Sequence, residues 1–320
     1  MATGMVMRIS ERAKSVGLLL AMTTVLPELL SGNTPLPLFL NPQVWFFLVL
    51  AYASPVLLLR ELAVRRGVGF GGLFIYGLAY GLLNEGVLAK TIFRETNVPI
   101  DTFSHYGFYG VGWPWTMLIC AWHALASVVF PVAIVHTIFA NASQRPWLDG
   151  RVALLLSFVL VVFACLFFIN DGASHHFGTP TELIALLTAM AALLAIGSRF
   201  KGTIAELRTT PLLRPVLVGL SLLVPFLVLI IVPGITLPVL VFFVIFAALL
   251  AGYLRYFSRH RLAMLPAMAF VGFAFYVQTA AMSLIALKQM ALFQGPVDAL
   301  VLLVLWRYLK RTDKQYPVAA

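Results

Sequence analysis

Long apolar runs joined by short polar links restrict this chain to a membrane fold. Each run is close to the roughly 20 residues that a helix needs to cross a bilayer. The ten runs cover residues 16–31, 43–59, 68–92, 113–140, 152–170, 181–198, 216–232, 238–254, 262–287 and 291–306. The chain is 61% hydrophobic and 11% charged, whereas a soluble domain carries about 25% charged residues. We therefore predict an all-α, polytopic integral membrane protein, in which residues 1–320 form one transmembrane domain of about ten helices.

The positions of Lys and Arg orient these predicted helices. If the N-terminus is cytoplasmic, only Lys90, Arg94 and Lys288 of the 22 basic residues fall in outer segments. Cytoplasmic loops attract basic residues during insertion, so both termini are predicted to be cytoplasmic. The same grouping beside apolar runs accounts for the net charge of +10, and no nucleic-acid partner is predicted. We expect a multi-pass protein of the cell membrane, with the lipid bilayer as its main partner.

Two ionisable residues lie well inside predicted helices, at similar depth. Glu85 is about eight residues from the outer end of its run, or ~12 Å deep at the helical rise. His123 is about eleven residues into the next run, or ~16 Å deep. Ionisable side chains at such depth are costly and face the bundle interior or a water-filled cavity. Because a short outer loop joins the two helices, we predict a polar site near the outer half of the membrane.

Residue spacing places each of these side chains on a defined helix face. Small residues and Glu85 recur every four positions, at Gly77, Gly81, Glu85 and Ala89. The polar residues of the next helix follow a 4-3-4 spacing, at Thr116, Cys120, His123 and Ser127. Small residues let another helix approach closely, so the first face is expected to pack tightly against a neighbour. Such a pattern is also typical of plain helix packing, in which a Glu–His contact is only a structural hydrogen bond.

Five further polar residues are candidates to complete the site. Asn84 and Lys90 flank Glu85, Asn170 and Asp171 end the fifth run, and Gln278 lies near the depth of His123. Lys90 can support the Glu85 carboxylate, or its long side chain can snorkel to the outer interface. Asn170 is the candidate that would donate a hydrogen bond during catalysis.

Metal and cofactor chemistry lacks a sequence signature here. His175 and His176 are adjacent, but no third ligand is spaced for zinc, and solvated loop histidines explain them equally. Cys120 and Cys165 lie inside predicted helices with no paired spacing. We predict no metal and no cofactor.

The segment 84–90, Asn-Glu-Gly-Val-Leu-Ala-Lys, resembles the first motif of the CAAX-processing and bacteriocin-processing (CPBP) intramembrane proteases. That motif is Glu-Glu-x-x-x-Arg, and its first Glu activates water. The resemblance assigns this role to Glu85, with Gly86 at the second Glu and Lys90 at the Arg. The second motif, Phe-x-x-x-His, corresponds to His123, with Ile119 in place of the Phe.

The third motif of that family, His-x-x-x-Asn, matches only in part. Asn170 or Asp171 falls at a suitable distance, but no His stands four residues before either. The resemblance covers about 90 of the 320 residues. Known CPBP members work toward the cytosolic side, whereas the site here faces outward, an orientation closer to the glutamic proteases that cleave anti-sigma factors.

Three functions are compatible with these residues. In a metal-independent intramembrane protease or hydrolase, Glu85 acts as general base on water, and His123 orients that water or stabilises the oxyanion. The substrate is then a membrane peptide or a lipid-like molecule. In a proton- or cation-coupled small-molecule transporter, the same pair carries the coupling ion near mid-membrane. In a non-catalytic membrane accessory subunit, the pair is structural.

Overall fold

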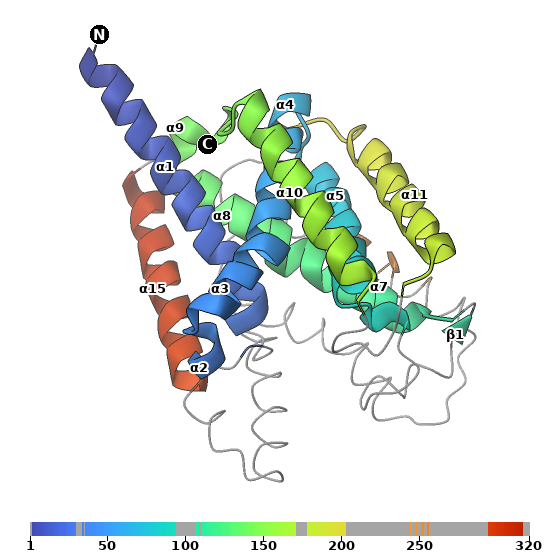
Figure 1. Cartoon of the computed structure of the whole chain (residues 1–320). Coiled ribbons are helices and arrows are strands. Elements are labelled where there is room, and N and C mark those ends of the chain that lie inside the picture. Colours follow the sequence, from blue (N-terminus) through green and yellow to red (C-terminus); the bar gives the residue numbers. More distant parts are fainter. Residues whose placement is uncertain are drawn as a thin grey trace.

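The computed structural model describes residues 2–29, 34, 36–93, 107–108, 110–170, 178–202 and 294–315, and six single positions between 244 and 255. Nearly all of this part is helical (Figure 1). The helices are α1 (Ala2–Thr24), η1 (Val25–Leu29), α2 (Leu36–Phe39), α3 (Pro42–Leu48), η2 (Val49–Ala53), α4 (Ser54–Arg66), α5 (Phe70–Leu82), η3 (Leu83–Leu88), η4 (Thr91–Phe93), α7 (Trp113–Trp122), η5 (His123–Val129), α8 (Phe130–Ile138), α9 (Ala140–Ser143), α10 (Gly150–Phe168), α11 (Pro180–Gly197) and α15 (Gln294–Gln315). Two short antiparallel strands, β1 (Gly107–Phe108) and β2 (Val111–Gly112), precede α7.

The first six predicted runs and the last one coincide with helices in this part of the chain. The first and last helices are longer than predicted, because α1 begins at Ala2 and α15 continues to Gln315 through charged residues that a hydropathy window leaves out. Runs 216–232 and 262–287, and most of 238–254, lie outside the described residues. The structure therefore tests neither the ten-helix count nor the side of the termini.

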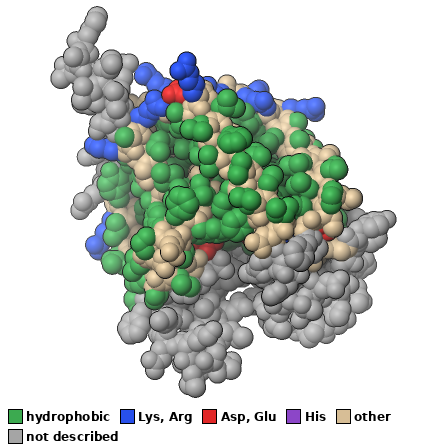
Figure 2. Space-filling view, viewed as in Figure 1, with side chains coloured by type: hydrophobic (Ala, Val, Ile, Leu, Met, Phe, Trp, Pro, Cys, Tyr) green, Lys and Arg blue, Asp and Glu red, His purple; other side chains and the backbone are tan. Residues whose placement is uncertain are grey.

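Four helices in the described ranges are long and apolar enough to cross a membrane. They span Pro42–Arg66, Trp115–Ile138, Gly150–Phe168 and Pro180–Gly197. The last two are α10 and α11. Of the most apolar 18-residue stretch of each, only 6% and 11%, respectively, is buried in the protein. Figure 2 shows hydrophobic side chains covering the visible face of the molecule. Such a surface is stable only where lipid or another apolar partner covers it.

The continuous helix α5–η3 is central to the packing. It packs mainly against α11 on one side and against α7 and η5 on another. A side chain at Gly77 would meet the Ala124 backbone at 2.5 Å, and one at Gly81 would meet the Cys120 backbone at 2.6 Å. The predicted tight packing of the Gly77–Gly81–Glu85 face is thus confirmed, and its neighbour is the helix that carries His123.

Basic residues gather at the end of the molecule formed by the termini of α4, α10 and α11 (Figure 2). Loop contacts hold these termini together. Arg65 donates to the Leu148 carbonyl, Arg66 donates to the Ser198 hydroxyl, and Lys201 donates to the Arg66 carbonyl. Three segments predicted to be inner, 60–66, 145–151 and 199–201, therefore lie at one end, as the charge pattern requires.

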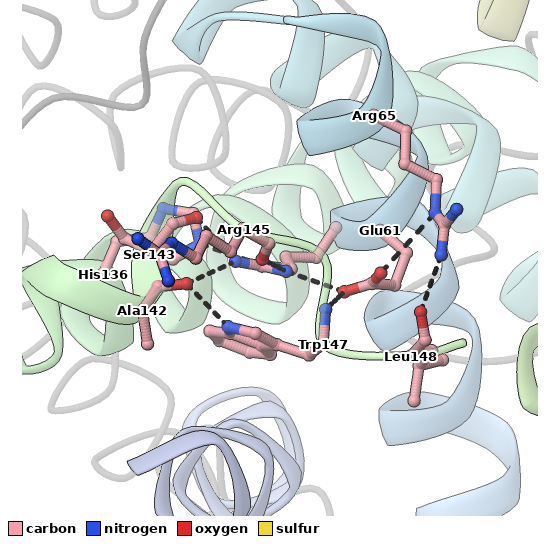
Figure 3. A network of polar contacts seen from close by, with 9 residues as sticks. Glu61, Arg65, His136, Ala142, Ser143, Arg145, Trp147 and Leu148 are labelled. Carbon is pink, nitrogen blue, oxygen red and sulfur yellow. Dashed lines mark hydrogen bonds and ion pairs between the residues drawn. The ribbon is translucent and has the colours of Figure 1, made fainter. Parts of the chain in front are cut away.

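Arg60 is completely buried at that same end, which the sequence did not indicate. Its guanidinium donates to Glu61, to the backbone carbonyls of Ser143 and Arg145, and to His136. It also lies 3.5 Å above the centre of the Trp147 ring. Figure 3 shows the hydrogen bonds and ion pairs of this region, which join α4 to the segment 142–148. We call Arg60, Glu61, His136 and Trp147 the Arg60 cluster.

Candidate functional site: a buried Glu–His pair in π-helical segments

Four buried polar side chains of the described residues lie in π-helical segments. In the described residues these segments are η1, η2, η3 and η5, and they carry Glu28, Tyr52, Glu85 and His123, respectively. A π-helical turn contains an extra residue relative to an α-helix and often marks a functional site, because it redirects side chains at some cost in backbone stability. Four helices thus depart from α-helical geometry where these polar groups occur.

Proline explains part of this local geometry. Pro55 and Pro131 each stand in the first turn of the α-helix that follows a π-helical segment, η2 and η5. Proline lacks an N–H group, so it leaves the carbonyl four residues earlier without its helical donor. For Pro55 that carbonyl belongs to Ala51, and it accepts a hydrogen bond of 3.1 Å from the Tyr80 hydroxyl instead. This bond ties η2 to α5 beside the site.

The structure brings Glu85 and His123 into direct contact. His123 Nε2 lies 2.8 Å from Glu85 Oε1, and both residues are buried, at 3% and 7% exposure. His123 Nδ1 lies 3.0 Å from the Ser127 hydroxyl, one turn further along the same helix. With its proton on Nε2, the imidazole donates to the carboxylate and accepts from the serine, so both ring nitrogens are satisfied.

The second oxygen of the Glu85 carboxylate is also held. Thr91, in the short helix η4, donates its hydroxyl hydrogen bond to Glu85 Oε2. Trp115 Nε1, near the start of α7, donates in turn to the Thr91 hydroxyl at 3.0 Å. Side chains from two other helices, η4 and η5, therefore hold the Glu85 carboxylate in position.

The rings of two tyrosines pack beside His123. The Tyr52 and Tyr80 rings lie 5.8 and 5.6 Å from the imidazole, centre to centre, and 6.0 Å from each other. Asn84, a predicted supporting residue, donates to the Tyr80 hydroxyl at 2.8 Å. Asn84 therefore helps to position the Tyr80 ring, while Glu85 contacts the histidine.

A second buried carboxylate, Glu28, belongs to the same region and had no partner that the sequence could name. It is 4% exposed and accepts hydrogen bonds from the hydroxyls of Tyr52 and Thr34. Tyr52 comes from the second predicted run, 24 residues away. Only the packing of η1 against η5 and the hydrogen bond from Tyr52 in η2 reveal the relation between Glu28 and the pair.

Lys90 does not snorkel to the interface, and that prediction is wrong. Its side chain is 1% exposed, and Nζ donates to the backbone carbonyls of Phe168 and Asn170 at the end of α10. The last carbonyls of a helix lack donors within the helix and carry partial negative charge, which a buried ammonium group neutralises. Lys90 thus joins the Glu85 helix to α10. Asn170 is exposed at this junction and takes part through its backbone carbonyl.

Other predicted residues lie outside the described part of the chain. They are Asp171, Gln278, His175 and His176. In the residues that the structure describes, no group of three or more His, Cys, Asp or Glu side chains is arranged to hold a metal ion.

The family comparison bears on the whole chain. Residues 17–312 match the model of a family described as an uncharacterized membrane protein family. The chain belongs to this family. Membership establishes it as a membrane protein, in agreement with its apolar helices. No curated protein and no solved structure matches the chain.

Proposed function

We propose that this membrane protein is an intramembrane hydrolase of the glutamic type, in which Glu85 and His123 activate a water molecule. The observation that carries the proposal is the 2.8 Å contact between Glu85 and His123, two buried ionisable groups from different helices. Intramembrane ionisable residues are expensive to bury and are functional by default. A membrane peptide or a lipid-like ester is the class of substrate that reaches such a site.

The geometry supports a division of roles. Glu85 takes a proton from water as it attacks a carbonyl carbon, and the proton then passes to the leaving group. His123 shares the proton with Glu85, while Ser127 fixes the orientation of the imidazole. Thr91 holds the other carboxylate oxygen. Asn170 remains the proposed hydrogen-bond donor to the substrate, as the family resemblance implies.

The experiment compares the peptide N-termini found in membranes with and without activity. Membranes from cells that lack the protein are reconstituted with wild-type protein, with Glu85→Gln or with His123→Gln, and new N-termini are quantified by mass spectrometry. We expect new N-termini with wild type, and an at least tenfold lower amount of them with either variant. Glu11→Gln, which removes a carboxylate in the middle of α1, is the matched control. Equal termini with wild type and Glu85→Gln would contradict peptide hydrolysis.

A proton-coupled transporter is the second candidate, and the buried Glu28 favours it. Two carboxylates are hydrogen-bonded to the ring cluster of Tyr52, Tyr80 and His123: Glu28 through Tyr52, and Glu85 through His123. Proton-carrying side chains of this kind are typical of transport pathways. Proteoliposomes with an internal pH-sensitive dye and an imposed pH gradient test this candidate. A proton flux that Glu85→Gln abolishes, without new peptide termini, would replace hydrolysis by transport.

We also propose a topology of about ten transmembrane helices with both termini cytoplasmic. It is supported by the charge pattern and by the common end at which α4, α10 and α11 place their basic residues. Protease accessibility of a C-terminal tag in right-side-out vesicles tests it. A tag that is cut from outside would contradict the proposed orientation.

A further inference from the structure

Three basic side chains come together where the end of α4 meets the end of α11. Arg66 is the last residue of α4, and its Nη1 donates to the Ser198 hydroxyl at 2.9 Å. Lys201 Nζ donates to the Arg66 backbone carbonyl at 2.8 Å. Arg199 belongs to the same short segment that follows α11. We call Arg66, Arg199 and Lys201 the α4–α11 corner.

Backbone contacts hold the chain on both sides of this corner. The Gly69 N–H donates to the Phe200 carbonyl at 2.9 Å, and the Gly202 N–H donates to the Gly67 carbonyl at 3.1 Å. One turn into α5, the packing is so close that a side chain at position 72 would meet the Gly197 carbonyl at 2.4 Å. The backbone positions that present the three cations are therefore fixed relative to one another.

The positive charge of the corner has no carboxylate partner in the described part of the chain. All three side chains are exposed, and no ion pair among the described residues includes them. The stretches 62–84 and 183–202, which form the corner and the helices on either side of it, contain no Asp or Glu. A guanidinium has five N–H donors and an ammonium has three. Arg66 and Lys201 each make one hydrogen bond through the side chain, so most of their donors remain available.

Apolar surface begins directly beside these cations. Phe200 lies between Arg199 and Lys201 in the chain and is 50% exposed, and Ile196, in the last turn of α11, is 46% exposed. Most of α11 is likewise unburied within the protein. Figure 2 shows basic side chains along the edge of the hydrophobic face. A molecule with an anionic head and long apolar chains is complementary to this arrangement.

We propose that the α4–α11 corner binds the headgroup of an anionic phospholipid, whose acyl chains lie along α11. Arg199 carries the largest share, because a guanidinium pairs with phosphate oxygens through parallel hydrogen bonds and this one makes no hydrogen bond within the described residues. Insertion of the chain explains why basic residues occur at this end. It does not explain why three of them meet on a fixed backbone with most of their donors unused. This inference does not depend on hydrolysis at Glu85.

The test measures lipid binding by native mass spectrometry of the whole protein in neutral detergent. Phosphatidylglycerol or phosphatidylcholine with the same acyl chains is added, and the fraction of protein with bound lipid is followed against lipid concentration. We expect wild type to bind phosphatidylglycerol more tightly than phosphatidylcholine. Each cation contributes roughly a fivefold gain in affinity for an anionic headgroup. Arg199→Gln should therefore weaken phosphatidylglycerol binding roughly fivefold, and Arg199→Gln with Lys201→Gln roughly 25-fold.

The control removes the same charge elsewhere. Arg12→Gln with Lys14→Gln takes two exposed cations from α1, and we expect it to leave phosphatidylglycerol binding unchanged. Equal weakening by this pair would overturn the inference, because it would show diffuse attraction in place of a site. Equal affinity of wild type for the two lipids would also overturn it.

Two further outcomes decide the remaining cases. Glycerol phosphate carries the anionic headgroup without acyl chains, and we expect it not to displace the lipid at equal concentration. Displacement would make the corner a site for free phosphate and contradict lipid binding. If the double variant at positions 199 and 201 does not fold, Arg199→Gln alone decides, since its side chain has no hydrogen bond or ion pair within the described residues to lose. Wild-type affinity for phosphatidylglycerol in Arg199→Gln would reject the inference.

Discussion

The Arg60 cluster and the Glu85 site both bury charge, but in different ways. Arg60 is 0% exposed and its planar guanidinium is satisfied by a carboxylate, a histidine and backbone carbonyls, over an aromatic ring. A hydrogen bond joins the Glu85 carboxylate to the His123 imidazole, and both residues belong to π-helical segments. Arginine stays charged at any physiological pH, whereas a Glu–His pair can exchange a proton. We infer a structural role for the first region, and for the second we propose the chemical one.

The largest expected effect is at Arg60. In Arg60→Met, the buried Glu61 carboxylate loses its ion-pair partner at 2.7 Å, and the carbonyls of segment 142–145 lose their donor. Breaking a buried ion pair from one side costs about 3–5 kcal/mol. We expect a loss of this size in thermal unfolding followed by size-exclusion chromatography. Arg66→Met, at an exposed arginine bonded to Ser198, should cost less than about 1 kcal/mol. Equal stabilities of the two variants would contradict a structural Arg60 cluster.

A smaller effect is expected where the Glu85 helix meets its neighbour. In Gly81→Val, the new side chain meets the Cys120 backbone and pushes α5 away from α7. Overpacking of this kind costs roughly 1–3 kcal/mol and also separates Glu85 from His123. We expect lower thermal stability together with loss of activity. Gly17→Ala is the control, since nothing lies within 4 Å of its new methyl group. A fully stable and active Gly81→Val would show that close packing is not needed to form the site.

Apolar runs and residue spacing could predict much of this molecule. Seven of the ten predicted runs coincide with helices in the part of the chain that the structure describes, because burial in lipid demands continuous apolar sequence. Four-residue spacing predicted that Gly77, Gly81 and Glu85 share one tightly packed face. Similar depth predicted that Glu85 and His123 lie close together.

Contacts between distant segments could not be predicted in this way. Arg60 was counted as an inner-loop charge, because its backbone acceptors lie more than 80 residues further along the chain. The partnership of Glu28 with Tyr52 depends on how two helices rotate against each other. The π-helical turns have no periodic signal in sequence. Pro55 and Pro131 mark where two of them end, but only the structure shows that Glu28, Tyr52, Glu85 and His123 all occupy such turns.

The smallest expected change in stability, and the largest in function, is at Glu85. Glu85→Gln keeps the shape of the side chain and its oxygen for Thr91, so the loss in thermal stability should stay near 1 kcal/mol. A structural pair and a functional pair differ in this respect, since only the functional pair loses activity out of proportion to stability when it is changed.

The direct test is to measure thermal unfolding and the appearance of peptide termini in the same preparations of wild-type protein and Glu85→Gln. We predict that Glu85→Gln unfolds within about 1 kcal/mol of wild type and produces at least tenfold fewer new termini. A variant that is strongly destabilised, or one that yields the same termini as wild type, would contradict a catalytic role for the Glu85–His123 pair.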